Sequence, residues 1–320
     1  MNIKKIGLTA LAGSLVAATS HAGEMSVAGS ASVAIEHINN DGGNSGKSYS
    51  MGNQLTFTGG GELDNGLNVS LSFVMDQNDD TSKTDGTAKT SNAGTPFDSH
   101  SVSISSDTLG TLTFHGEGGS SATTAVDATA AGDIWDQFDD EGGLEPSGVG
   151  SGDNMMFYTT PSVMDGLSLS ASYLPNTGAA QTQIGYSATY TGVEGLSVTY
   201  ATGDGSLTTT DATVMKASYA YGPVTVAYSD YEYDASGTSS DDDVTSYKVS
   251  YTVSDELSVS YGAEELETGT TDSEYDSVSA SYTAGGMTLT ATFSDATDID
   301  GGADGSEDRE RWAISASFAF

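Results

Sequence analysis

Residues 167–173 read Leu167-Ser168-Leu169-Ser170-Ala171-Ser172-Tyr173, so that every second side chain is apolar or aromatic. A β-strand turns successive side chains to opposite faces, and this stretch therefore predicts a strand with one apolar face and one small, polar face. The same alternation recurs in residues 67–73, 247–253 and 287–293. Helical periodicity is almost absent after the first residues, which indicates an all-β protein.

Runs of this kind follow one another along the whole chain. We expect sixteen strands near 25–37, 50–63, 67–76, 99–105, 111–117, 154–160, 167–174, 182–191, 195–202, 211–221, 223–232, 243–253, 256–262, 275–283, 286–294 and 309–320. No linker or domain boundary interrupts them, so the strands form a single domain.

The connections between these strands alternate in length. Short ones such as Asp64-Asn65-Gly66 and Asp165-Gly166 carry the residues that tight turns need. Between them lie long, polar, acidic segments at 38–49, 77–98, 118–153, 203–210, 233–242, 263–274 and 295–308. Short turns at one end and long loops at the other describe an up-and-down meander. A soluble sandwich would have more varied connections, whereas lipid outside and water inside suits a sixteen-stranded antiparallel transmembrane β-barrel.

Tyrosines support the barrel. Strand parity places ten of them on the apolar face, several near strand ends where an aromatic girdle meets the membrane interface. They are Tyr173, Tyr186, Tyr190, Tyr219, Tyr221, Tyr228, Tyr247, Tyr251, Tyr261 and Tyr282. Aromatic packing between strands of a soluble sheet is the alternative. The loop asymmetry and the export signal described next favour the girdle.

Residues 1–22 have the pattern of a secretory signal peptide. Lys4 and Lys5 precede the apolar stretch 6–18, and Ser20-His21-Ala22 supplies small residues for cleavage after Ala22. The mature barrel then spans 23–320. The chain of 320 residues has 45 Asp and Glu against 9 Lys and Arg, a net charge of −36 and no Cys. This charge disfavours a nucleic-acid partner, and the lack of Cys excludes disulfides and thiolate chemistry.

Two stretches resemble the trimeric general porins of Gram-negative outer membranes. The chain ends in Trp312-Ala313-Ile314-Ser315-Ala316-Ser317-Phe318-Ala319-Phe320, similar to the final strand of outer-membrane proteins. The segment 118–153 lies between a strand beginning Leu109-Gly110-Thr111 and a strand ending Tyr158-Thr159-Thr160-Pro161, like the long third loop of these porins. The resemblance implies a third loop folded into the pore, a passive channel, a homotrimer, an outer-membrane location, and recognition of Phe320 by the barrel-assembly machinery.

The candidate functional residues follow from this arrangement. If 118–153 lies in the pore, its carboxylates form an acidic constriction that favours cations, whereas a solvated surface loop is the alternative. These carboxylates are Asp127, Asp133, Asp136, Asp139, Asp140, Glu141 and Glu145. Parity assigns a second set to the pore wall, namely Glu36, Glu62, His115, Glu117, Phe157, Lys216, Lys248, Arg309 and Arg311. Phe157 stands where the family commonly has Arg, so a full arginine ladder is not expected.

Other activities have less support. Asp298, Asp300 and Asp304 offer oxygen ligands for Ca²⁺ or Mg²⁺, but they lack EF-hand spacing, and no cofactor is required. Enzymatic motifs such as a nucleophile elbow or a phosphate loop are absent, so we expect no enzyme. A cation-preferring diffusion channel in outer-membrane lipid is the favoured function. A substrate-specific channel and a non-channel structural or adhesin barrel are the alternatives.

Overall fold

The computed structural model describes residues 25–40, 46–76, 80–81, 98–123, 129–141, 152–175, 182–205, 210–235, 241–268, 271–299 and 308–320. The predicted signal peptide lies outside these residues. Among them, no helix has the length and apolar character needed to cross a membrane.

Nearly every described element is a strand. The elements are β1 (Met25–Asn40), β2 (Gly46–Glu62), β3 (Asn68–Asp76), β4 (Asp80–Thr81), β5 (Ser99–Ser106), β6 (Gly110–Glu117), the 3₁₀ helix η1 (Trp135–Glu141), β7 (Met155–Thr159), β8 (Leu167–Leu174), β9 (Gln183–Tyr190), β10 (Leu196–Asp204), β11 (Thr210–Tyr221), β12 (Val224–Ala235), β13 (Asp242–Thr252), β14 (Leu257–Thr268), β15 (Thr271–Ala284), β16 (Met287–Thr297) and β17 (Arg309–Ala319).

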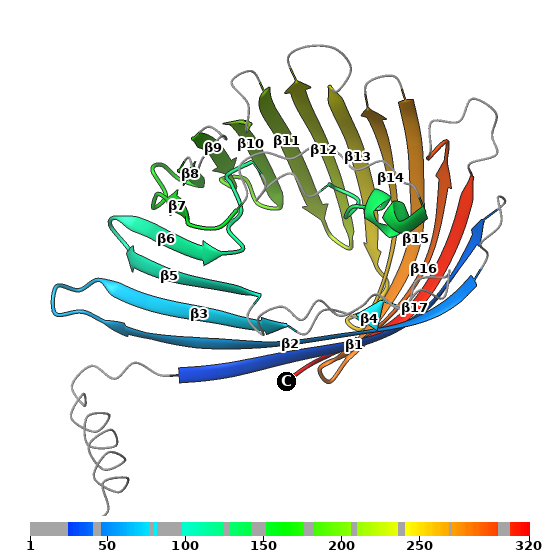
Figure 1. Cartoon of the computed structure of the whole chain (residues 1–320), viewed down its shortest axis with the longest axis horizontal. Helices are drawn as coiled ribbons and strands as arrows, with labels where there is room; N and C mark the ends of the chain where they lie inside the picture. Colours follow the sequence, from blue (N-terminus) through cyan, green and yellow to red (C-terminus); the bar gives the residue numbers. More distant parts are fainter. Residues whose placement is uncertain are drawn as a thin grey trace, which may run out of the picture.

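Antiparallel pairing runs around a closed ring (Figure 1). Each long strand pairs with its neighbours in chain order, and β1 pairs with both β2 and β17, which closes the barrel. The short β4 contributes two residue pairs to β2, beyond the part of β2 that pairs with β3. The wall therefore has sixteen strands, as the sequence predicts.

Tight turns join the strands at one end. Gly66, Gly166, Gly195 and Gly222 all have positive φ there, a conformation that glycine adopts without a steric penalty. The predicted short connections are confirmed at these positions.

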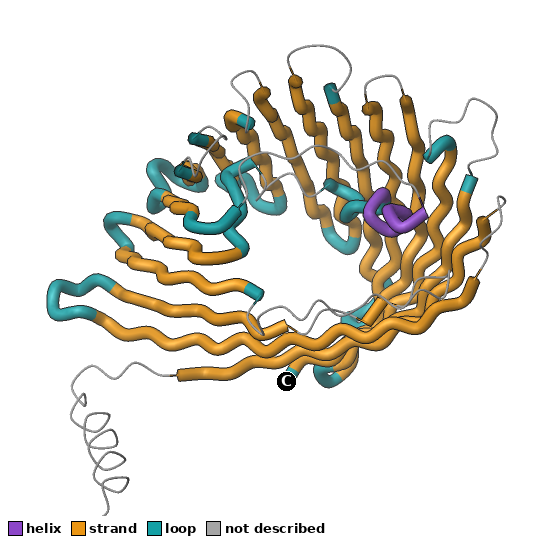
Figure 2. The backbone as a smooth tube through the Cα atoms, in the orientation of Figure 1, coloured by secondary structure: helices purple, strands orange, loops and turns teal. Residues whose placement is uncertain are grey.

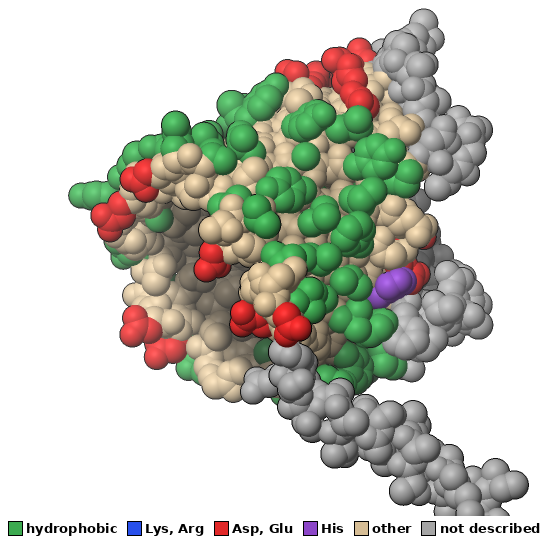
Figure 3. Space-filling model, turned by 90° about the vertical axis from the view of Figure 1, so that its left-hand side faces the viewer, with side chains coloured by type: hydrophobic (Ala, Val, Ile, Leu, Met, Phe, Trp, Pro, Cys, Tyr) green, Lys and Arg blue, Asp and Glu red, His purple; other side chains and the backbone are tan. Residues whose placement is uncertain are grey.

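The two faces of the wall differ as expected from the alternation. Outward side chains such as Val249, Leu169 and Phe293 are apolar and exposed. Inward ones are largely Ser and Thr, which form hydroxyl pairs across strands, for example Ser260 with Ser279 at 3.0 Å. Hydrophobic side chains cover much of the outer surface in Figure 3, beside a hollow opening. This is the pattern of a barrel with lipid outside and water inside.

All ten tyrosines predicted on the apolar face lie there, and nine of them are exposed. Beyond Tyr228, Tyr247 and Tyr261, toward the long loops, the outer face of β11–β17 becomes acidic. We call these residues the outer carboxylates: Asp211, Asp230, Glu232, Asp234, Asp243, Glu265, Glu267, Asp272, Glu274, Asp276, Asp295 and Glu310. Several face one another across strands, as Asp276 faces Asp295. Mutual repulsion requires water or polar headgroups around them, so they mark where the lipid-facing band ends.

The outer carboxylates also explain the main difference from the predicted strand ends. β14 continues to Thr268, although residues 263–268 are predicted as loop. Once the outer face leaves the lipid, its side chains are Glu265 and Glu267, and the apolar alternation disappears while the backbone pairing with β15 goes on.

Lysine substitutions on the two faces of β13 test this assignment. Val249 lies outside between the levels of Tyr247 and Tyr251, and Ser250 is its inward neighbour. We expect Val249→Lys to lower the free energy of unfolding by about 2–4 kcal/mol, because the charge enters hydrocarbon, and Ser250→Lys to change it by under about 1 kcal/mol. Urea unfolding in lipid vesicles measures both, and equal effects would contradict the assignment.

Candidate functional site

The segment after β6 turns back onto the inner wall of the barrel. Gly119 and Gly152 exchange backbone hydrogen bonds of 3.2 and 2.9 Å, which tie the two ends of the segment together. The Ala122 amide then donates to the inward Ser172 hydroxyl on β8 at 2.9 Å. Gly185 on β9 leaves room for this bond, since a Cβ there would lie 2.7 Å from the Ser172 Oγ that accepts it.

Residues 129–135, which we call the elbow, lie against the inner wall of β11–β14. Backbone amides of the elbow donate to inward serines: Ala130 to the Ser229 hydroxyl at 2.8 Å, and Ala131 to the Ser246 hydroxyl at 2.9 Å. Small polar side chains thus give the elbow hydrogen-bond partners that water would otherwise provide.

Two lysines of the wall bind carbonyl oxygens of the elbow. Lys216 on β11 donates to the Thr129 carbonyl at 3.4 Å, and Lys248 on β13 donates to the Ala131 carbonyl at 3.1 Å. Both lysines face inward as predicted, and each donates a hydrogen bond to the elbow.

Glu264 on β14 lies beneath the elbow and is 3% exposed. Its Oε2 accepts the amides of Ile134 at 2.7 Å and Trp135 at 3.1 Å. Its Oε1 accepts the Thr129 hydroxyl and, at 3.4 Å, the Ser246 hydroxyl. The sequence does not predict Glu264 as a pore-wall residue. Its inward parity on β14 is the signal for such a position, but the apolar alternation predicts a loop over residues 263–274.

The helix η1 follows the elbow and lies within the ring of strands (Figure 2). Gln137 links η1 to the wall: its Oε1 accepts hydrogen bonds from the Ser294 hydroxyl at 2.9 Å and from Nη1 of Arg311 at 2.8 Å. The Arg311 guanidinium also pairs with Glu36 of β1, with its Nε 3.1 Å from Oε2. Arg311 therefore joins β17, β1 and η1.

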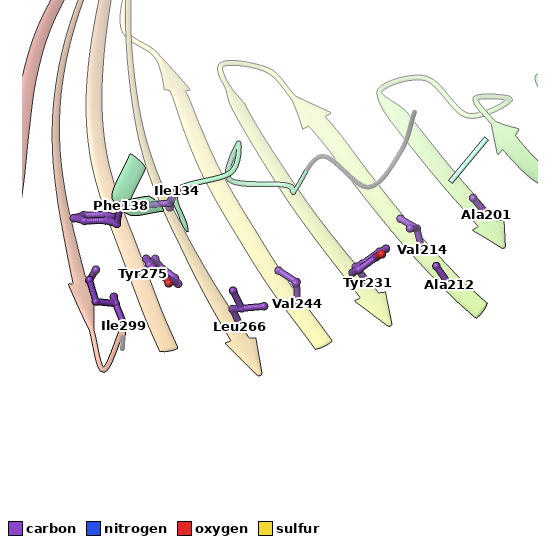
Figure 4. Packing of buried hydrophobic residues seen from close by; sticks show 11 residues of the cluster. Ile134, Phe138, Ala201, Ala212, Val214, Tyr231, Val244, Leu266, Tyr275 and Ile299 are labelled. Atoms are coloured by element: carbon purple, nitrogen blue, oxygen red, sulfur yellow. The ribbon is translucent and has the colours of Figure 1, made fainter. Parts of the chain in front are cut away.

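An apolar cluster packs the elbow and η1 against the inner wall of the barrel (Figure 4). Phe138 of η1 packs against Tyr275, with ring centroids 5.9 Å apart. The cluster comprises Ile134, Phe138, Ala201, Ala212, Val214, Tyr231, Val244, Leu266, Tyr275, Ala296 and Ile299. Its strand members face inward, so this part of the wall is covered and not lined by water.

The predicted constriction residues are placed as follows. Asp133 is half-buried with a φ of 54°, and its carboxylate accepts the Thr129 amide at 2.9 Å. Asp136 is exposed on η1. Asp139, Asp140 and Glu141 belong to η1, but their side chains lie outside the described part, as do Asp127 and Glu145 entirely. Their predicted role stays a prediction.

The predicted wall residues mostly share the inward face. Glu36, Lys216, Lys248 and Arg311 make the contacts given above. Arg309 shares the face of Arg311, and register pairs place the others with inward residues: Glu62 opposite Asn68, His115 opposite Ser101, and Phe157 opposite Thr113 and Ser172.

Glu117 is the exception, and its predicted inward position is wrong. The pairing of β5 with β6 shifts register between His100 and Ser101, so that Glu117 lies opposite His100. His100 stacks on Phe73 of the outer face, and its Nδ1 is 3.8 Å from the Glu117 carboxylate. A β-bulge adds one residue to a strand and reverses the parity beyond it.

Of the three predicted metal ligands, Asp298 alone belongs to the described residues. Asp298 is exposed with a φ of 56°, and Asp300 and Asp304 lie outside the described residues. Within the described ranges, no three His, Asp or Glu side chains are arranged to hold a metal ion.

Comparison with known families agrees with this geometry. Residues 7–277 match the model of the Gram-negative porin family. This protein belongs to the Gram-negative porins. It is therefore an outer-membrane channel protein, in a family of channels and not of enzymes. No curated protein sequence matches this porin significantly.

Solved structures share the fold of this porin. An anion-selective porin from Comamonas acidovorans superposes with a TM-score of 0.69 at 16% identity, covering 93% of this chain and 100% of that one. A mutant form of the Rhodopseudomonas blastica porin also superposes with a TM-score of 0.69 at 16% identity and with the same two coverages. A triple mutant of that porin gives a TM-score of 0.68. At this identity the likeness establishes the barrel fold alone.

Gly262 offers a test of the close approach of the elbow. A Cβ at Gly262 would lie 2.7 Å from the Ala131 Cβ, closer than real side chains approach. We expect Gly262→Ala to displace the elbow and to speed amide exchange in a peptide spanning 129–135 by about tenfold, equivalent to about 1.4 kcal/mol of lost protection.

Hydrogen-exchange mass spectrometry measures the effect. Gly59→Ala is the matched control, since it adds the same methyl group to the outer face of β2, where its Cβ would lie 3.6 Å from Met25 within one copy of the chain. Unchanged exchange in Gly262→Ala would show that the elbow does not rest on β14.

Proposed function

We propose that this porin is a passive diffusion channel for small hydrophilic solutes, with a preference for cations. One observation carries the proposal. Lys216, Lys248 and Arg311 are bound to elbow carbonyls, Gln137 or Glu36, whereas Asp136 is exposed inside the ring of strands. These three basic side chains still contribute positive charge to the lumen, but they lie against the wall, behind the elbow and η1.

The proposed selectivity arises from electrostatics in a narrow passage. Carboxylates on a segment that lies across the lumen raise the local concentration of cations, and low-dielectric walls strengthen their field. The Debye length is about 8–10 Å near physiological ionic strength, so the preference should be strongest in dilute salt.

The Comamonas porin is described as anion-selective. The same barrel can hold either preference, because selectivity depends on the charges along the passage and not on the fold. Phe157 is consistent with cation preference here, since this inward position carries no positive charge.

Charge removal on the constriction tests the mechanism. We expect the variant D133N/D136N/D139N/D140N to lower the K⁺/Cl⁻ permeability ratio by about twofold or more, because it removes four negative charges from the passage. Reversal potentials in a planar bilayer under a salt gradient measure the ratio. The control D272N/E274Q/D276N/D295N removes four charges from the outer face. An unchanged ratio in the first variant would place its carboxylates outside the ion path.

We also propose that three copies assemble through the outer face of β1. Ala31 provides a small-residue surface there and Gly59 continues it on β2, whereas the Phe320 ring lies over Gly29. The outer carboxylates disfavour the face of β11–β16, because a second copy would bring like charges together. Phe320 pairs reciprocally with the Gly29 backbone at this seam, at 2.9 and 2.7 Å. Its exposed ring is the proposed signal for the barrel-assembly machinery.

Photo-cross-linking distinguishes an interface on the outer face of β1 from one on the outer face of β13. A benzophenone amino acid in place of Ala31 should give adducts between copies in outer membranes, whereas the same group in place of Val249 should react with lipid alone. Denaturing gels show the adduct masses. Protein adducts from position 249 together with none from position 31 would contradict the proposed interface.

A further inference from the structure

We propose that Glu264 positions the candidate constriction, acting as a buried template on which the elbow takes its shape. This inference rests on the proposed function in one respect: the segment it positions is taken to shape the passage. The contacts themselves do not depend on what passes through the pore.

Both carboxylate oxygens of Glu264 are used, and for different parts of the elbow. Oε2 accepts two successive amides, those of Ile134 and Trp135, at 2.7 and 3.1 Å, which fixes the direction of the chain where η1 begins. Oε1 accepts the hydroxyl of Thr129 at the other end of the elbow. One side chain thus holds both ends of a seven-residue bend.

Thr129 carries this effect into the backbone of the bend. Its Oγ1 accepts the amides of Gly132 at 3.1 Å and Asp133 at 2.6 Å. The Asp133 carboxylate accepts the Thr129 amide in return, and Asp133 has a positive φ, which non-glycine residues adopt only when their surroundings require it. The conformation of the elbow therefore depends on a hydroxyl that Glu264 orients.

A carboxylate suits this role better than a neutral group. The hydrogen-bond partners of Glu264 among the described residues are neutral N–H or O–H donors, and a carboxylate accepts at both oxygens. Gln would offer one oxygen, so it could serve the amides or Thr129 but not both. Burying a charge is costly without such partners, and here they come chiefly from the elbow.

The flanking lysines constrain the elbow less. Lys216 and Lys248 each bind one carbonyl through a flexible ammonium group, which imposes little direction. Glu264 is therefore the contact that selects one shape of the bend, and the lysines add attraction to it.

Trp135 provides a direct readout. The chain has two tryptophans, and Trp312 lies on the outer face, so Trp312→Phe leaves Trp135 as the only tryptophan reporter. In the full-length W312F porin in detergent or vesicles, we expect E264Q to raise acrylamide quenching of Trp135 at least twofold and to shift its emission to longer wavelength. Single-channel recordings of E264Q should show additional subconductance levels.

E265Q is the matched control, because it removes the same charge from the next residue, which is on the outer face and exposed. It should leave the quenching and the sublevels unchanged. T129V, which leaves the wall intact, should move both readouts in the same direction as E264Q and keeps the test valid if E264Q assembles poorly. Heat-modified gel mobility confirms that each barrel is folded.

Quenching in E264Q and T129V equal to that in E265Q would overturn the positioning role. Absence of conductance in the parent porin would instead overturn the proposed function, and the fluorescence comparison would still decide the role of Glu264. Increased quenching with unchanged conductance would also overturn the inference, because Glu264 would then hold a bend that does not shape the passage.

Discussion

The pairing of β1 with β17 is the interaction on which the rest of the structure depends. An unpaired backbone N–H or C=O in hydrocarbon costs several kcal/mol, and a sheet in lipid is stable only when it has no free edge. The ladder from Ser30–Ala319 to Asn40–Arg309 removes both edges together. With the backbone satisfied within the wall, side chains alone face lipid outside and the lumen inside.

Because the backbone is satisfied within the wall, the inward side chains are free both to line a wetted lumen and to bind an enclosed segment. Serine and threonine are small enough to leave a lumen and polar enough to be wetted. They also accept backbone hydrogen bonds, as Ser172, Ser229 and Ser246 do for amides of the enclosed segment. A segment can therefore lie on the wall without burying unpaired amides, at positions where Ser, Lys or Glu is provided.

Much of the barrel could be predicted from the sequence because period-two alternation reports directly which side of a strand meets lipid. The prediction failed where that relation stops. β14 runs past the lipid, so Glu265 and Glu267 hide a paired strand, and the β-bulge in β6 reverses the parity at Glu117. Both failures come from backbone pairing, which side-chain pattern records only indirectly.

The candidate site could be predicted only in outline. The length and acidity of 118–153 indicate an enclosed segment, and the parity of Lys216, Lys248 and Arg311 is right. Their partners could not be predicted, since Glu264 binds residues about 130 positions earlier in the chain. Val244 and Leu266 are apolar residues on the inward face, which the sequence alone does not explain. The structure shows that both are buried in the cluster that includes Ile134 and Phe138.

The contacts of the elbow also constrain the order in which this porin can be assembled. Its partners lie on β11, β12, β13 and β14, all of which follow it in the chain. The elbow therefore has no surface to settle on while only the first strands exist. The bonds between the elbow and the wall can form only once β11–β14 are in place, and before that stage water must satisfy the amides and carbonyls of the elbow.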